Sequence, residues 1–183
     1  MDTFLATKIN SGAIFTDKGK RQTVTYLKAE PLTVKLVKTM AKDGYEALVC
    51  ALGEKLQEIR LKETSALKSG EQIKVADVFA PGDWIKVSGS SKGRGFAGVI
   101  KRHGFHGVGG RTHGQSDRQR HPGSSGMRTT PGRLWKGKRM AGHYGNDTIA
   151  IKNLQIIKVE DSLLTISGTV PGSRNALIKL HKI

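Results

Sequence analysis

The feature that most constrains the fold is a basic, glycine-rich stretch in the middle of the chain, at residues 86–145. It holds 13 Lys or Arg and one acidic residue, Asp117, which gives a net charge of +12, whereas the rest of the 183 residues carries only +4. The stretch also contains 15 of the 23 glycines and five of the six histidines. Its apolar residues are isolated, as at Phe96, Phe105 and Met127, so it cannot bury enough surface to offset the entropy of its own ordering.

This composition predicts a partner for the central stretch. A structureless insertion of this length is uncommon inside a compact domain unless it is functional. Dense glycine lets the backbone approach a polyanion closely, and Lys and Arg neutralise phosphates. We therefore expect the stretch to bind nucleic acid and to be ordered by it.

The sequence on both sides of the central stretch predicts β-structure, because short apolar runs alternate with polar residues and turn formers. A helix between Glu46 and Leu61 remains an alternative, since Leu48, Leu52, Leu56 and Ile59 also fit a period of 3.6. Asp43-Gly44 is a hairpin signal. The expected strands are 21–28, 32–38, 45–52, 56–61, 72–79, 84–87, 148–159, 163–170 and 176–183.

Many short strands with regular turns indicate a small closed barrel or a sandwich. We predict a mainly β fold: a discontinuous β-barrel domain at 1–88 and 146–183, with a long loop extension at 89–145. No apolar run reaches the roughly 18 to 20 residues needed to cross a bilayer, so no membrane contact is expected. The single cysteine, Cys50, cannot form an intramolecular disulfide, which favours a reducing cytoplasm.

Two glycine-rich motifs in the central stretch resemble nucleotide or RNA signatures. Gly93–Gly98 matches the dinucleotide fingerprint GxGxxG, but that motif needs a helix after its glycines, and Val99–Gly104 runs into more glycine, which predicts no such helix. Arg94–Lys101 overlaps the signature of RNA-recognition modules, yet its later aromatic positions hold Gly98 and Lys101, which cannot stack on a base. We expect neither a nucleotide cofactor nor an RNA-recognition module.

Metal binding and catalysis are also disfavoured. Five histidines lie in the central stretch, but no paired cysteine or acidic ligand completes a zinc site. Cys50 sits in an apolar run, and Asp117 has no second carboxylate nearby to share acid and base chemistry. The sequence predicts no enzyme, no cofactor, no metal and no small-molecule substrate.

Trp135 lies among cations in Arg133–Met140, an arrangement that suits stacking on a base. A small apolar cluster with Leu134 and Met140 explains it equally well. Trp84 follows Pro81-Gly82-Asp83 in a predicted strand, which favours a place in the core or at its rim.

The central stretch resembles the signature of a known family. The run Val87–Arg102 (VSGSSKGRGFAGVIKR) is similar to that of the universal large-subunit ribosomal protein L three, bacterial type. The similarity continues, in order, through Thr112-His113-Gly114, His121–Ser124, Gly126, Thr130–Arg133, Lys136–Gly142 and Gly145-Asn146, and more weakly at Ile14–Asp17, Asp43–Tyr45 and Val170–Gly172.

The resemblance implies a translation-protein-like β-barrel with a long extension that threads into large-subunit rRNA towards the peptidyl transferase centre. It implies a structural, primary rRNA-binding protein that attaches near the 3′ end of that RNA and helps to nucleate assembly, with ribosomal proteins fourteen and nineteen as neighbours. The rRNA-binding residues expected on these grounds, and from their charge or aromatic character, are Lys92, Arg94, Lys101, Arg102, His103, Arg111, His113, Arg118, Arg120, His121, Arg128, Arg133, Trp135, Lys136, Lys138, Arg139 and His143.

Three departures from the family pattern stand out. The region between Gly53 and Gly70 is shorter than in typical members, so we expect the family's α/β insertion on the barrel to be trimmed. Ile9–Ala13 replaces the basic stretch with Gly-Met-Thr that usually precedes the first strand, and Met127 stands where many bacterial members carry a methylated glutamine. We therefore expect altered N-terminal contacts and no such methylation. A free RNA or DNA chaperone with a basic loop is the alternative function; it predicts weak, sequence-indifferent binding and no residence in a particle.

Overall fold

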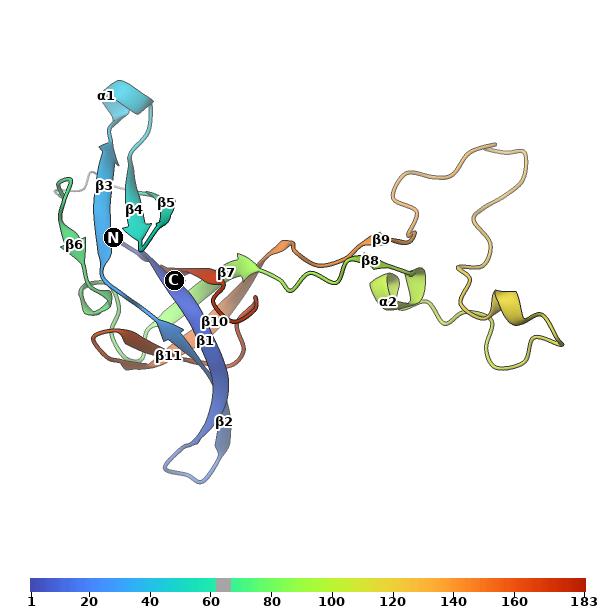
Figure 1. Ribbon diagram of the computed structural model, residues 1–183, viewed down its shortest axis with the longest axis horizontal. Helices are drawn as coiled ribbons and strands as arrows, with labels where there is room; N and C mark the ends of the chain where they lie inside the picture. The colour runs from blue at the N-terminus through green and yellow to red at the C-terminus, as the bar shows by residue number, and fades with distance from the viewer. Residues whose placement is uncertain (62–66) are drawn as a thin grey trace. The chain divides into compact units, whose positions relative to one another are not determined.

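The computed structural model describes residues 1–61 and 67–183, which form two compact units. The first unit, here called the ring unit, comprises Met1–Ser91 and Thr148–Ile183. The second comprises Lys92–Asp147 and is called the basic segment. Strands dominate the regular structure, as Figure 1 shows, so the prediction of a mainly β fold is confirmed.

Six strands of the ring unit close on themselves in the order β1-β12-β7-β10-β11-β2, and every neighbouring pair is antiparallel. The closed arrangement leaves no unpaired sheet edge among these strands. Their bounds are β1 (Thr3–Phe15), β2 (Arg21–Lys28), β7 (Trp84–Ser90), β10 (Thr148–Val159), β11 (Leu163–Ser167) and β12 (Leu177–Lys182).

Alternation of side chains explains why these segments close around a core. On β7 Ile85 and Val87 are fully buried, and on β12 Ile178 and Leu180 are, while the residues between them are at least partly exposed. A side-chain period of two places such residues on one face of the strand. Each fully buried Ile or Leu contributes about 1.5 to 3 kcal/mol relative to an exposed one.

A second sheet completes the ring unit, with the order β5-β4-β3-β6. Its strands are β3 (Leu32–Lys38), β4 (Ala47–Leu52), β5 (Lys55–Arg60) and β6 (Gln72–Ile73), and the short helices α1 (Met40–Asp43) and η1 (Val75–Asp77) lie beside them in the chain. One continuous apolar cluster joins this sheet to the ring. The buried residues that the sheet, η1 and the residues after η1 add to it are Leu32, Val34, Leu48, Cys50, Leu52, Ile59, Ile73, Val75 and Phe79.

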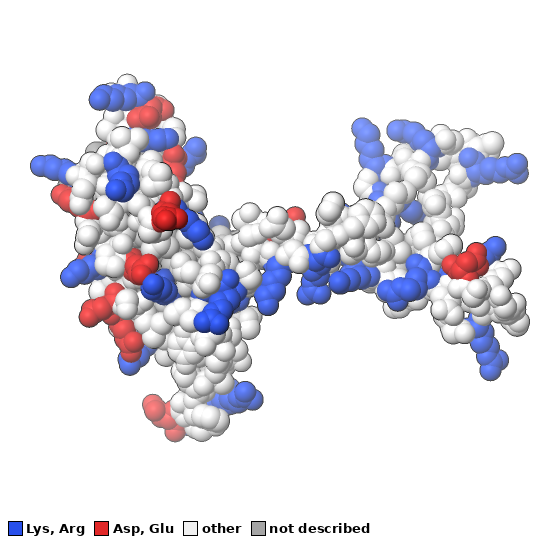
Figure 2. Space-filling model, in the orientation of Figure 1, with Lys and Arg blue, Asp and Glu red and all other residues white. Residues whose placement is uncertain are grey.

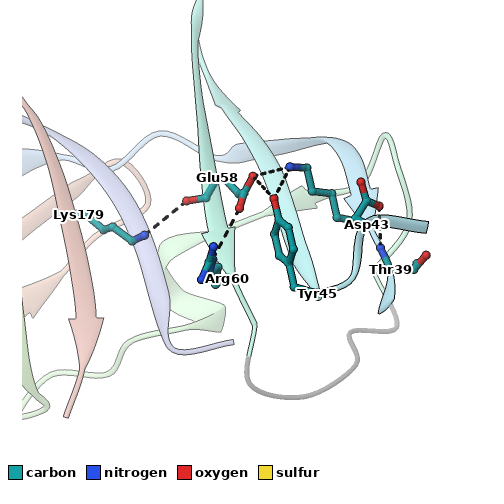
Figure 3. A network of polar contacts seen from close by, with 7 residues as sticks. Thr39, Asp43, Tyr45, Glu58, Arg60 and Lys179 are labelled. Atoms are coloured by element: carbon teal, nitrogen blue, oxygen red, sulfur yellow. Dashed lines mark hydrogen bonds and ion pairs between the residues drawn. The ribbon is translucent and has the colours of Figure 1, made fainter. Parts of the chain in front are cut away.

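A polar network lies on the second sheet (Figure 3). Lys38 Nζ donates to Glu58 Oε2 at 2.7 Å and to Tyr45 Oη at 2.6 Å, and the Tyr45 hydroxyl donates to the same carboxylate oxygen at 3.2 Å. Because Lys38 donates to it, the pKa of Glu58 is lowered, and the pKa of Lys38 is raised by the same contact. Lys179 of β12 donates to the Glu58 carbonyl at 3.4 Å, so the network also ties the sheet to the ring.

Most strand predictions are confirmed, three of them with the predicted bounds: 21–28, 32–38 and 148–159. The region from Glu46 to Leu61 forms two strands, so the helical alternative is wrong there. The hairpin predicted at Asp43-Gly44 is confirmed, because β3 and β4 pair antiparallel; their connection contains the helical turn α1, closed by Gly44 in the left-handed region. One detail differs: residues 72–79 form only a two-residue strand followed by η1.

The longest strand, β1, was absent from the predicted strands. Its first residues, Thr3 to Ala6, are buried consecutively, and the residues from Thr7 to Phe15 are half-buried or exposed, so no period of two is visible. A bulge between Lys8 and Asn10 shifts the register against β2 and breaks the pattern further. The strand is defined by its partners β12 and β2 on either side.

Candidate nucleic-acid interface

A short β-ribbon and a short helix give the basic segment its local order. The ribbon pairs β8 (Phe96–Ala97) with β9 (Gly142–His143), and Arg94 and Tyr144 extend it through two backbone hydrogen bonds: Arg94 N–H to Tyr144 O at 2.8 Å and Tyr144 N–H to Gly95 O at 3.0 Å. The helices are α2 (Val99–His103) and η2 (Ser116–Arg118). In this segment, all of which the structure describes, only Ala97 and Val99 are buried.

The ribbon and α2 each depend on a glycine with positive φ. Gly145 has φ of +75°, and a Cβ there would collide with the Lys92 carbonyl, so the two strands can approach closely only at glycine. Gly104 ends α2 in the left-handed region with φ of +74°, and its N–H donates to the Ile100 carbonyl at 2.9 Å.

The end of α2 is tied to the chain that returns from the far part of the segment. Arg102 Nη1 donates to the Met140 carbonyl at 2.8 Å, and His103 Nε2 lies 3.0 Å from the same oxygen. Both side chains are half-buried. Lys138 Nζ also lies 3.3 Å from the Ser124 carbonyl. These three predicted site residues therefore also have a structural role inside the segment.

The other predicted site residues lie on the surface of the segment. Lys92, Arg94, Lys101 and the cations and histidines from Arg111 to His143 are exposed, and so is Trp135. The structure brings Arg94 and His143 together at the ribbon and Arg133 beside Trp135, but it spreads the remaining residues along the segment rather than converging them on one point. An arrangement of this kind can track an extended polyanion.

The basic segment has far fewer acidic residues than cations. It contains 12 Lys or Arg against two acids, Asp117 and Asp147, so at least ten cations lack a carboxylate of their own within the segment. Figure 2 shows Lys and Arg side chains along its whole length, whereas the ring unit mixes both signs. Ion pairs such as Lys28–Glu30, Lys158–Glu160 and Lys182–Asp83 lie in the ring unit.

Aromatic side chains accompany the cations. Trp135 is 64% exposed, and the Arg133 guanidinium lies 5.8 Å from its ring centroid. Leu134 and Met140 are also exposed, so neither forms a buried cluster with Trp135. Trp84 of the ring unit is 53% exposed, which places it outside the core. Phe96 and Tyr144 were not predicted as site residues, although Phe96 directly follows Arg94-Gly95 and Tyr144 stands between His143 and Gly145 in the sequence, which was the available signal.

The helix after the GxGxxG glycines corrects one prediction. We expected no helix there, but α2 begins directly after Gly98. Gly104 ends this helix, so the helix fits into the five residues between the two glycines. The helix has only five residues, and β8 before it is a two-residue strand that pairs antiparallel with β9. A dinucleotide fold instead requires a full helix packed on a parallel sheet.

Other kinds of site find no support in the described residues. Over 1–61 and 67–183, no three His, Cys, Asp or Glu side chains come together in a way that could hold a metal ion. Within the same ranges, no helix is both long and apolar enough to cross a membrane. Among the hollows of the basic segment, one of about 410 Å³ is lined by Ser125–Arg128 and Gly132–Leu134, and one of about 460 Å³ by Val108, Asp117, Arg118 and His121–Gly123.

Fold and site together define a class: a β-ring protein that carries an inserted, cation-covered, glycine-rich segment. Comparison with known proteins then gives the family. The model of the family described as Ribosomal protein L3 matches residues 50–163. The large ribosomal subunit protein uL3 of Herpetosiphon aurantiacus is 41% identical over 100% of this chain and 96% of its own length.

Further relatives agree with this assignment. The uL3 proteins of Dehalococcoides mccartyi strain 195 and of Chlorobium limicola are 44% and 39% identical, over 96% and 100% of this chain and 95% and 99% of their own lengths. The chain belongs to the ribosomal protein L3 family, and the resemblance seen in the sequence is confirmed.

Proposed function

We propose that the chain is a structural, non-catalytic constituent of the large ribosomal subunit that binds large-subunit rRNA through its basic segment. In this proposal it attaches near the 3′ end of that RNA, helps to nucleate subunit assembly, and extends the basic segment towards the peptidyl transferase centre. The observation that supports this proposal is the composition and exposure of the basic segment. The segment has 12 cations against two acids, almost all of the cations are exposed, and only two of its residues are buried.

Binding follows from counterion release. Each cation that meets a phosphate displaces condensed counterions, and this gain offsets the several kcal/mol that ordering the segment costs on binding. A footprint of about 6 to 10 phosphates lowers the affinity roughly 10³- to 10⁵-fold between 50 and 200 mM salt. Contacts to phosphate and RNA shape outnumber base-edge contacts in such an interface.

The proposal includes a location and neighbours. The protein resides in ribosomes of the cytoplasm, beside ribosomal proteins fourteen and nineteen, and takes part in translation as a component of the particle. Its site residues are the seventeen predicted above, of which Arg102, His103 and Lys138 also hold the segment together.

Sucrose-gradient sedimentation tests the proposal. Lysate carrying the tagged full chain is compared with lysate carrying a variant in which Gly93–Gly142 is replaced by a short Gly-Ser linker, at low and high salt. We expect the full chain to stay with the large subunit at high salt. We expect the variant, folded by circular dichroism, to be lost from the subunit or to stall in precursor particles.

Two results would refute the proposal. If the full chain moves to the light fractions at high salt, a free nucleic-acid chaperone becomes the better account. If the linker variant sediments with mature subunits as well as the full chain does, the basic segment is not the anchor.

A further inference from the structure

The β8–β9 ribbon exposes a phenylalanine that its own fold does not use. Phe96 is 72% exposed, whereas the next residue of β8, Ala97, is 4% exposed and lies on the opposite face of the ribbon. The buried face of the ribbon therefore belongs to Ala97. A large ring is held on the other face by a hydrogen-bonded backbone, where a partner can reach it.

Phe96 is one of a group of rings rather than a single exposed side chain. It pairs directly across the ribbon with His143, and the two ring centroids lie 6.0 Å apart at an interplanar angle of 81°. Next along the ribbon, the Arg94 guanidinium lies 5.8 Å from the centroid of the Tyr144 ring. The ribbon therefore carries two such pairs, Phe96 with His143 and Arg94 with Tyr144. In a perpendicular pair only one face or edge of each ring is used, which leaves ring surface free.

The charge around these rings selects the kind of partner. The segment carries 12 cations against two acids, which favours an anionic ligand. The exposed ring of Phe96 favours a ligand with a planar group that can stack on it. An RNA strand with an unpaired base has both properties: its bases have π-faces and its backbone is anionic. Phe96 has no hydrogen-bonding group, so it stacks on a base without reading its identity.

We propose that Phe96, supported by His143, is a stacking site for an unpaired nucleobase of large-subunit rRNA, and that Arg94 contacts the neighbouring phosphate. This rests on the proposed function and adds a contact to it that is not electrostatic. Stacking on aromatic side chains is worth about 1 to 3 kcal/mol per base, which corresponds to about 5- to 150-fold in affinity.

The experiment uses the full chain and an in-vitro transcript of the large-subunit rRNA of Herpetosiphon aurantiacus. Three variants are compared with the wild type: Phe96→Leu, which keeps an apolar side chain without a ring; Phe96→Trp, which restores a ring; and Phe15→Leu, a control at a phenylalanine of β1 with 74% exposure. Filter binding gives the Kd over a range of salt, and cross-linking at 254 nm with mass spectrometry locates the protein–base adducts.

We expect Phe96→Leu to lose about 5- to 150-fold in affinity, with an unchanged salt dependence because no charge is removed. Phe96→Trp should bind as the wild type does, Phe15→Leu should not differ from it, and wild-type adducts should include Phe96 or His143. The stacking proposal is overturned if Phe96→Leu behaves as Phe15→Leu does, if Trp fails to restore binding, or if no adduct forms on the ribbon.

Failure of the proposed function looks different. In that case the wild type itself does not bind the transcript with a steep salt dependence, and all variants are equally weak. Loss of the Phe96 effect with wild-type binding and salt dependence intact would remove the stacking site alone.

Discussion

Removing three exposed cations from the middle of the basic segment should flatten the salt dependence of RNA binding. Arg118, Arg120 and Arg128 are exposed, and the segment has ten more cations than acids. The perturbation is their joint replacement by glutamine, which keeps a long polar side chain without the charge.

The magnitude follows from counterion release. Each phosphate contact contributes about 0.7 to 0.9 to the slope of log affinity against log salt, so three contacts contribute about 2 to 3. Referred to 1 M salt, this amounts to about 100- to 500-fold in affinity at 0.1 M. The assay is filter binding of the full chain to large-subunit rRNA between 0.05 and 0.3 M salt.

A matched control removes the same charge from the ring unit. Lys35, Lys42 and Lys55 are exposed cations on or beside the second sheet, and their joint change to glutamine should leave the slope nearly unchanged. Equal slopes for the two triple variants would refute the reasoning, because binding would then depend on total charge rather than on the segment.

Three further predictions concern the structure itself. Gly145→Ala should loosen the ribbon, seen as faster hydrogen exchange of the Arg94 and Tyr144 amides, because a Cβ collides with the Lys92 carbonyl; Gly110→Ala, with ordinary φ and open space, is the control. Leu180→Ala should cost about 2 to 5 kcal/mol in urea unfolding, because the side chain is fully buried in the ring, and a cost below 1 kcal/mol would contradict that packing. Because the pKa of Glu58 is lowered in the folded state, its stabilising contribution is present above its unfolded pKa of about 4.3 and is lost as pH falls through the folded value. Glu58→Gln should therefore show a smaller fall of Tm between pH 5 and 3 than the wild type, and identical slopes would count against the contact with Lys38.

Strands formed by short apolar runs between polar residues and turn formers could be predicted from sequence, because that pattern is local to each strand. At β2, β3 and β10 the predicted bounds are those of the structure. Strand β1 could not be predicted, since its pairing with β12 depends on a segment more than 160 residues away and not on its own pattern. The closure of six strands into a ring depends on which strands pair with which, and the sequence of a single strand does not specify its partners.

The candidate site shows the same division. Charge is visible in sequence whatever the conformation, so the cations could be named before their positions were known. The pairing of β8 with β9 could not be predicted from sequence. For the same reason, neither the ring contact between Phe96 and His143 nor the hydrogen bond from Arg102 to the Met140 carbonyl could be predicted. These contacts join residues that lie about 40 to 50 positions apart in the chain. They depend on glycines with positive φ, and the sequence shows only that a glycine can adopt such a value, not that it does.

Strands β7 and β10 pair Ser90 directly with Thr148, although 57 residues lie between them in the chain. The ring therefore holds the two ends of the insertion one strand spacing apart, whatever the residues between them do. Loop closure becomes more costly only by about 0.6 kcal/mol for each doubling of length, so an insertion eight times shorter changes ring stability by only about 2 kcal/mol, in the favourable direction. The length of the insertion is thus nearly independent of the scaffold that carries it: the insertion can become longer or shorter while the ring keeps one sequence pattern and one fold.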